Sequence, residues 1–186
     1  ATPLINSLAP AEGMLAGSAA LLVRKPRILS SSIGQSVPIV SKLNELTVTI
    51  AVNLQLRQQD GWSISITGLN GTAQMSDVVE LRAVPAVCSV SGLFCQGGIA
   101  NRGAWLSQSG GPMRRVDLCP NMALSAEYDH VVSFQVLNGE APQASPSVSI
   151  HIEGSSEIMM APRLMSKTNA TGGLTGSPAA RRGVDG

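Results

Sequence analysis

Hydrophobic and polar residues alternate along two neighbouring stretches of the chain. Between residues 46 and 54 aliphatic side chains occupy every second position, with threonine, alanine and asparagine between them. After a polar break at 57–61, a second alternating run covers 62–67 and is followed by the sequence Gly-Leu-Asn-Gly. Alternation of period two with many β-branched residues is typical of half-buried strands. The two runs therefore predict paired antiparallel strands, whose apolar face a second sheet has to cover.

Six further strands are predicted by shorter runs of the same kind. They cover 27–33, 76–84, 104–107, 113–119, 130–137 and 146–153. The runs recur roughly every ten residues, and no long amphipathic helix interrupts them. This spacing favours an all-β fold, an immunoglobulin-like antiparallel β-sandwich of seven to eight short strands with irregular N- and C-terminal extensions.

The predicted sandwich occupies the middle of the chain. Residues 1–26 contain scattered alanine, glycine and proline with weak periodicity, which predicts an N-terminal lead-in or linker. Residues 27–154 carry the predicted strands and form the β-sandwich domain. Residues 155–186 end in a stretch rich in glycine, serine and alanine, which predicts a linker or flexible tail. Within the domain, residues 85–103 have two cysteines and four glycines without a sustained period, which predicts a loop.

Few residues of this chain carry charge. Charged residues make up 13% of the sequence, against about 25% in ordinary soluble domains. The formal net charge is +1, so no global field attracts nucleic acid or anionic lipid. Aromatic residues make up 3%, too few for the stacking platforms that single-stranded bases need, and no apolar run is long enough for a transmembrane segment. A surface of serine and threonine in place of charges suits an extracellular or cell-surface domain.

Three segments of the chain resemble a known repeat. They are LTVTIAVNLQL (46–56), SISITGLNGT (63–72) and VVSFQVLNGEAPQASPSVSIHIEG (131–154). Together with Ala104-Trp105, they are similar to the tandem repeat domain found many times over in very large, predicted secreted or surface proteins of dinoflagellates and other microalgae. Gly139 stands where that family's pattern has proline. The resemblance covers residues 27–154 and implies an immunoglobulin-like structural repeat without catalytic residues. For a structural repeat, the expected partners are neighbouring repeats or copies of itself, or a larger protein assembly.

The chain has three cysteines, Cys88, Cys95 and Cys119. In an oxidising compartment one pair forms a disulfide, and the third thiol stays free or bonds another chain. Any of the three pairings would fix the 85–103 loop, either to itself or to the strand at 113–119. Three ordinary unpaired thiols are the alternative. Zinc spacing is absent, because six residues separate Cys88 from Cys95 and only two histidines exist to help.

Nothing in the sequence indicates catalysis or a cofactor. His130 lies at the start of a predicted strand, and His151 lies on the polar face of another. Both are predicted to be solvated surface side chains, because no Gly-x-Ser-x-Gly elbow or comparable nucleophile motif accompanies them. The acidic residues are scattered singly, without the spacing of a calcium loop. We therefore expect no catalytic residue, no metal ion and no cofactor.

Two triplets match the N-glycosylation acceptor pattern. Asn70-Gly71-Thr72 lies in a predicted turn, and Asn169-Ala170-Thr171 lies in the predicted tail, both of them accessible places. Asn70 and Asn169 are therefore candidate glycosylation sites if the protein enters the secretory route.

Two kinds of function fit these patterns. The first is a non-catalytic structural or adhesive repeat of a secreted or cell-surface assembly, with an accessory subunit of a larger protein complex as a variant on the same fold. The second is a small-ligand or carbohydrate-binding module that uses the 85–103 loop. Its only plausible stacking residues are Trp62 and Trp105, and both are in step with core-facing positions, which predicts that they lie in the core. Low charge, hydroxylic faces and the repeat resemblance favour the first.

Overall fold

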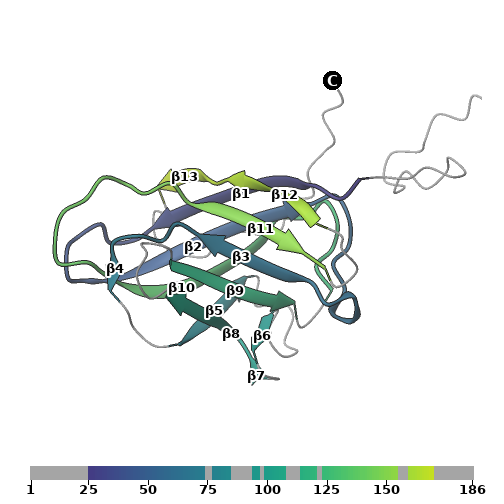
Figure 1. Ribbon diagram of the computed structural model, residues 1–186, viewed down its shortest axis with the longest axis horizontal. Helices are drawn as coiled ribbons and strands as arrows, with labels where there is room; N and C mark the ends of the chain where they lie inside the picture. The colour runs from purple at the N-terminus through teal and green to yellow at the C-terminus, as the bar shows by residue number, and fades with distance from the viewer. Residues whose placement is uncertain are drawn as a thin grey trace, which may run out of the picture.

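The computed structural model of this chain describes residues 25–73, 77–84, 94–96, 99–107, 114–120, 123–154 and 159–169. Within these residues the chain forms thirteen strands and one short 3₁₀ turn at Gln58–Asp60 (Figure 1). The strands build two packed layers, so the predicted all-β sandwich is confirmed.

One sheet contains the first and the last strand. Its order is β13 (Ser166–Asn169), β1 (Ile28–Gln35), β2 (Leu43–Val52), β10 (His130–Asn138) and β5 (Val78–Val84), with the short β4 (Thr72–Ala73) also pairing with β10. β1 and β13 run parallel, and every other pair in this sheet is antiparallel. The parallel pair differs from the wholly antiparallel sandwich that the sequence predicts.

The second sheet faces the first across the core. Its order is β12 (Met159–Leu164), β11 (Ser149–Glu153), β3 (Ser63–Thr67), β9 (Arg114–Pro120), β8 (Arg102–Ser107) and again β5. A small hairpin, β6 (Phe94–Gln96) with β7 (Ile99–Ala100), extends this sheet from the end of β9.

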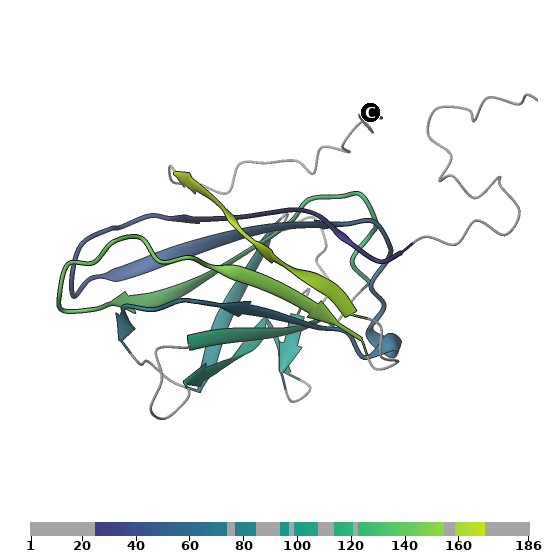
Figure 2. The ribbon, with the colours of Figure 1, turned by 45° about the horizontal axis from the view of Figure 1, so that its top comes forward.

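Two segments cross from one sheet to the other. Residues 81–84 of β5 pair with β10, whereas residues 78–80 pair with β8, so a single strand belongs to both sheets. On the opposite side, the chain passes from β12 in one sheet to β13 in the other through the buried Met165. Figure 2 shows this second crossing as the yellow-green strand that rises from β11 to the edge of β1.

Most of the core consists of the side chains that alternation assigns to the inner faces, and Leu56, Phe94, Leu124 and Met160 add to it from segments without alternation. The largest fully buried ones include Phe134, Ile50, Ile64, Ile66, Ile150 and Ile152, drawn from both sheets. Each buried aliphatic side chain contributes roughly 1.5–3 kcal/mol. Burial from both sides therefore holds the two sheets face to face, as the period-two pattern predicts.

Two strands lie where the sequence predicts a linker or tail. β12 and β13 extend the sandwich beyond residue 154 to Asn169. Alternation is hidden here because Pro162 interrupts the run and a register shift between Ile150 and Ile152 offsets β12 from β11. Proline is tolerated at this place because β12 is an edge strand.

Part of the predicted 85–103 loop also forms strands. β6, β7 and the first residues of β8 occupy its second half, while residues 85–93 and 97–98 lie outside the described residues. Strands of two or three residues are too short to show a period, which is why alternation does not reveal them.

One core position carries a hydroxyl that finds no partner. Ser31 on β1 is 4% exposed, and its Oγ makes no hydrogen bond in the described structure. A buried unsatisfied polar group costs stability, so we expect Ser31→Ala to raise the free energy of unfolding by about 1 kcal/mol. Urea denaturation measures the change, with the half-buried Ser32→Ala as the matched control. A lower free energy of unfolding in Ser31→Ala would show that the Ser31 hydroxyl stabilises the fold.

Candidate functional site

The seam between β1 and β13 joins the two ends of the described sandwich. Its parallel register runs from Ser32 opposite Ser166 to Gln35 opposite Asn169. Because the strands are parallel, the chain enters the sandwich at the start of β1 and leaves it at the far end of the same strand. A strand rises about 3.3 Å per residue, so these two points are separated by most of the length of β1 (Figure 2).

Side chains tie the C-terminal segment to the start of β1. The Arg163 guanidinium on β12 donates from Nη1 to the carbonyl oxygens of Ile28 at 2.9 Å and Leu29 at 2.7 Å. Hydrogen bonds from a charged donor are stronger than those between neutral groups. Arg163 therefore holds β1 at the place where its backbone has not yet begun to pair with β13.

Asn53, just after β2, holds the chain before it enters β1. Its Oδ1 accepts from the Arg27 backbone N–H at 2.8 Å, and its Nδ2 donates to the Lys25 carbonyl at 2.9 Å. Further along, the Met165 backbone N–H donates to the Val148 carbonyl at 2.9 Å, and the Lys167 Nζ donates to the Ser145 carbonyl at 3.1 Å. Contacts thus fix both strands of the seam to the body of the sandwich.

At the end of the sandwich where β13 stops, side-chain hydrogen bonds hold the loop between β1 and β2 in place and form a rim. The Asn44 side chain is 1% exposed, accepts from the backbone N–H groups of Ser36 and Val37, and donates to Asn138 Oδ1 at 3.0 Å. Asn138 in turn donates to the carbonyls of Val37 and Ile39, both at 2.7 Å. These bonds fix the loop between β1 and β2 beside an open groove of about 720 Å³.

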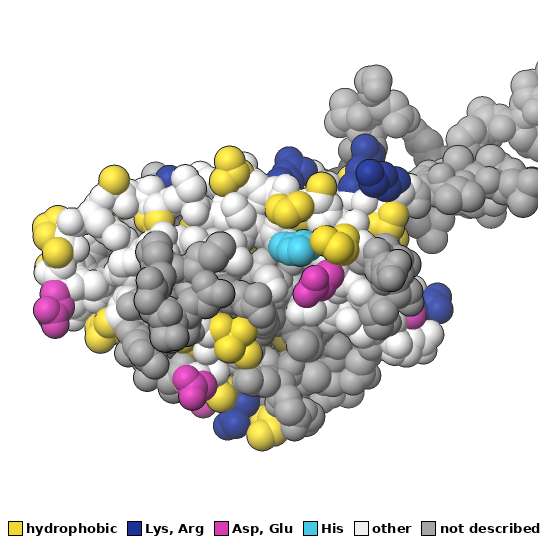
Figure 3. Space-filling view, in the orientation of Figure 1, with side chains coloured by type: hydrophobic (Ala, Val, Ile, Leu, Met, Phe, Trp, Pro, Cys, Tyr) yellow, Lys and Arg dark blue, Asp and Glu magenta, His cyan; other side chains and the backbone are white. Residues whose placement is uncertain are grey.

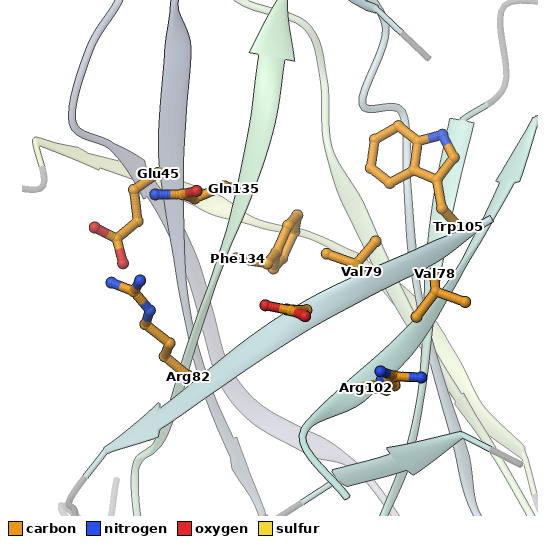
Figure 4. Close-up of a pocket in the computed structure, with 9 residues that line it drawn as sticks. Glu45, Val78, Val79, Arg82, Arg102, Trp105, Phe134 and Gln135 are labelled. Carbon is orange, nitrogen blue, oxygen red and sulfur yellow. The ribbon is translucent and has the colours of Figure 1, made fainter. Parts of the chain in front are cut away.

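A cavity of about 380 Å³ lies at the place where β5 changes sheets. Figure 4 shows Glu45 and Arg82 pointing toward one another on one side, and Arg102 on the other side of Val79. Glu45 accepts a hydrogen bond from the Ser133 hydroxyl at 2.8 Å. With Glu80, the cavity is lined by two guanidinium and two carboxylate groups, whose formal charges cancel.

Both tryptophans are core residues, as alternation predicts. Trp62 is 5% exposed and Trp105 is 3% exposed, so neither offers a free face for a sugar ring to stack on. Trp105 lines the cavity at β5, and its indole Nε1 has no hydrogen-bond partner in the described structure. Arg102 of the 85–103 segment also lines this cavity, which is therefore the described place where a small ligand could bind.

The register of β6 and β9 brings two of the three cysteines opposite each other. Cys95 pairs with Cys119 across these antiparallel strands, while Cys88 lies outside the described residues. Directly opposed antiparallel residues have Cα atoms about 4.5–5.5 Å apart, within the range that a disulfide spans. Of the pairings that the sequence leaves open, Cys95 with Cys119 is the one that the backbone register favours.

We therefore expect an oxidised protein to carry a Cys95–Cys119 cross-link and a Cys88 thiol free of it. Peptide mapping under non-reducing conditions, with alkylation of free thiols before digestion, measures this directly. A cross-linked peptide that contains Cys88 would contradict the register-based assignment. Cys95→Ser and Cys88→Ser form the matched pair of variants, since only the first should remove the cross-link.

The histidines do not gather with other potential ligands. His130 Nε2 lies 2.9 Å from the Ser125 carbonyl oxygen. His151 is half-buried on β11 and its Nε2 has no partner among the described residues, so it is less exposed than the sequence predicts. Within the described part of the chain, no group of three or more histidine, cysteine or acidic side chains could hold a metal ion.

The two candidate glycosylation asparagines occupy different surroundings. Asn70 lies in the turn between β3 and β4, where its backbone carbonyl accepts from Gln143 Nε2 at 2.8 Å and its side-chain Oδ1 is buried. Asn169 is the last described residue of β13, and the structure describes its backbone alone. Asn70 as a whole is half-buried, and a glycan would be attached to the other atom of its amide, Nδ2.

The visible face of the sandwich carries few charges. Figure 3 shows hydrophobic side chains scattered among polar ones over this face, and acidic and basic groups standing mostly apart. None of the described segments is a helix of the length and apolarity that a bilayer crossing requires.

Comparison with known proteins adds no relative to this picture. No protein-family model matches the chain, and no curated protein matches it. The resemblance to microalgal repeats remains a prediction from the strand motifs, and a functional proposal has to rest on the geometry of the seam and the cavity.

Proposed function

We propose that this chain is a non-catalytic structural module of a secreted or cell-surface assembly, joined in series to neighbouring modules. The observation that carries the proposal is the parallel pairing of β1 with β13, which places the points of chain entrance and exit at opposite ends of the sandwich. Modules of this kind can follow one another along a line without the chain doubling back. Terminal strands that ran antiparallel would bring both ends to the same side.

Other features agree with a connecting role. The described surface is rich in serine and threonine, and the formal net charge of the chain is +1. The rim beside the chain exit is fixed by the Asn44 and Asn138 hydrogen bonds, and it presents Ile39 (55% exposed) and Leu43 (48% exposed) to a neighbour. Partners would be neighbouring modules or copies of the same sandwich.

The test uses cells that make the protein. An antibody against the folded sandwich should label intact cells or their surroundings, and it should detect a polypeptide much longer than 186 residues on a reducing denaturing gel. Protease treatment of intact cells should remove the signal. A free polypeptide of single-module size inside the cell would overturn the proposal, and its co-purification with a larger complex would identify an accessory subunit instead.

A second candidate function is the binding of a small neutral ligand in the cavity at β5. Its four charged lining groups cancel in charge yet can donate and accept hydrogen bonds, which suits a hydroxylated molecule such as a monosaccharide. NMR titration with a panel of neutral monosaccharides tests this, with the unpartnered Trp105 indole N–H as the reporter. Binding should shift that signal and be lost in Arg102→Ala but kept in the distant Arg57→Ala. No shift with any sugar would exclude this class of ligand.

A further inference from the structure

The seam between β1 and β13 lies directly in the path of any tension between the two ends of the sandwich. A pull on the chain before Lys25 draws β1 toward its start, and a pull on the chain after Asn169 draws β13 in the opposite direction. Because the two strands are parallel neighbours, they can separate under this load only by sliding past one another lengthwise.

The direction of sliding decides how the hydrogen bonds break. Backbone bonds between parallel strands are evenly spaced along the pair, and lengthwise sliding loads all of them at once. Strands that are pulled apart from a shared end lose the same bonds one after another. Loading bonds together raises the barrier to unfolding, and resistance to forced unfolding is governed by that barrier rather than by equilibrium stability.

Side-chain contacts of the seam oppose the same movement. Arg163 donates hydrogen bonds to the carbonyl oxygens of Ile28 and Leu29 at 2.9 and 2.7 Å, so β1 cannot slide without breaking both of these bonds. On β13, Lys167 bonds the Ser145 carbonyl, and Met165 just before it is 6% exposed in the core. Arg163 thus ties β1 to β12 in the second sheet, and Lys167 ties β13 to the segment between β10 and β11.

We propose that the β1–β13 seam is a mechanical clamp, which keeps the sandwich folded while the chain carries tension between its ends. This inference rests on the proposed role as a module joined in series, since tension reaches the seam only if both ends are held. In this proposal β13 and Arg163 resist the tension between the chain ends, a role that no pattern in the sequence predicts.

Single-molecule pulling on the full chain tests the clamp. In one arrangement the handles are attached at the two chain termini, which loads the seam by sliding. In the other, one handle is attached at Ile39, which follows the end of β1 and is 55% exposed, and the second at the C-terminus. This second arrangement peels β13 from β1 starting at Asn169, so it breaks the same bonds in sequence.

We expect the unfolding force to be several times higher with handles at the two termini than with the handle at Ile39. Arg163→Ala should lower the force in the first arrangement and leave the peeling force unchanged, because Arg163 holds the start of β1. Lys42→Ala, in the loop beside the seam, is the matched control and should change neither. Equal forces in the two arrangements would overturn the clamp.

This outcome is separable from that of the proposed function. If the two arrangements give equal unfolding forces and the protein is found within a long surface chain, the proposed serial module stands and the clamp does not. If the sliding arrangement gives a high force but the protein is found as a free single module, the proposed serial role is wrong. The seam would then resist a tension that the protein does not carry.

Discussion

Phe134→Ala is expected to lower the free energy of unfolding by about 3–5 kcal/mol. The ring is 1% exposed in the centre of β10, between β2 and β5. Its removal takes away burial from both sheets and enlarges the cavity at β5, which the ring already borders. Because one side of the ring already faces this cavity, few neighbouring side chains can move in to fill the space that the ring leaves.

Urea denaturation followed by tryptophan fluorescence measures the loss for Phe134→Ala. The neighbouring Gln135→Ala is the control, because Gln135 is exposed on the opposite face of β10 and its truncation should change stability by less than about 0.5 kcal/mol. If Phe134→Ala fails to fold, Phe134→Leu gives a milder measurement at the same position. Equal midpoints for the variants at Phe134 and Gln135 would show that the ring is not part of the core.

Gly68→Ala is expected to be the most damaging substitution outside the core. Gly68 has a φ of 85°, a conformation that costs other residues roughly 1–2 kcal/mol. A Cβ at this position would also collide with the backbone carbonyl of Ser147, which cannot turn aside as a side chain can. The two costs add, so we expect a loss above about 2 kcal/mol.

Gly71→Ala is the matched control for the collision at Gly68. Gly71 has a φ of 82°, almost that of Gly68, but a Cβ there would meet the side chain of Gln143, which can rotate away. Rotation of Gln143 breaks its hydrogen bond to the Asn70 carbonyl, so the difference between the two variants in chemical denaturation is a lower bound on the cost of the backbone collision. A larger loss in Gly71→Ala than in Gly68→Ala would contradict this account.

The central strands can be predicted from the sequence because each places aliphatic or aromatic residues on its core-facing side, although some small residues of the other side, such as Ser65 and Ser133, are buried as well. Aliphatic or aromatic residues recur at every second position within 46–52, 63–67, 132–136 and 149–153, and the structure buries them. Edge strands bury less and tolerate irregularity, so the period weakens at β12, where Pro162 and a bulge interrupt it. The sequence pattern thus identifies the middle of each sheet better than its borders.

The seam and the cavity depend on relations that no local pattern encodes. Ser32 and Ser166 pair although they are 134 positions apart in the sequence, and the polar composition of β13 gives no sign of a partner. The cavity exists because β5 divides its pairing between two sheets, whereas the run at 76–84 predicts an ordinary strand. Both features belong to the arrangement of the strands rather than to any one of them.

The late position of β13 in the chain has a consequence for how the protein is made. Contacts between residues far apart in sequence form slowly, and during synthesis β1 emerges from the ribosome long before β13 exists. Until residues 166–169 arrive, the backbone of β1 at residues 32–35 is an open edge that a strand of another chain could occupy. A chain that ends at Met165, which keeps β12 and lacks β13, should therefore form more oligomers on gel filtration than one that ends at Asn169. In the proposed row of modules, β13 would also protect each newly made sandwich from exchanging strands with its neighbour.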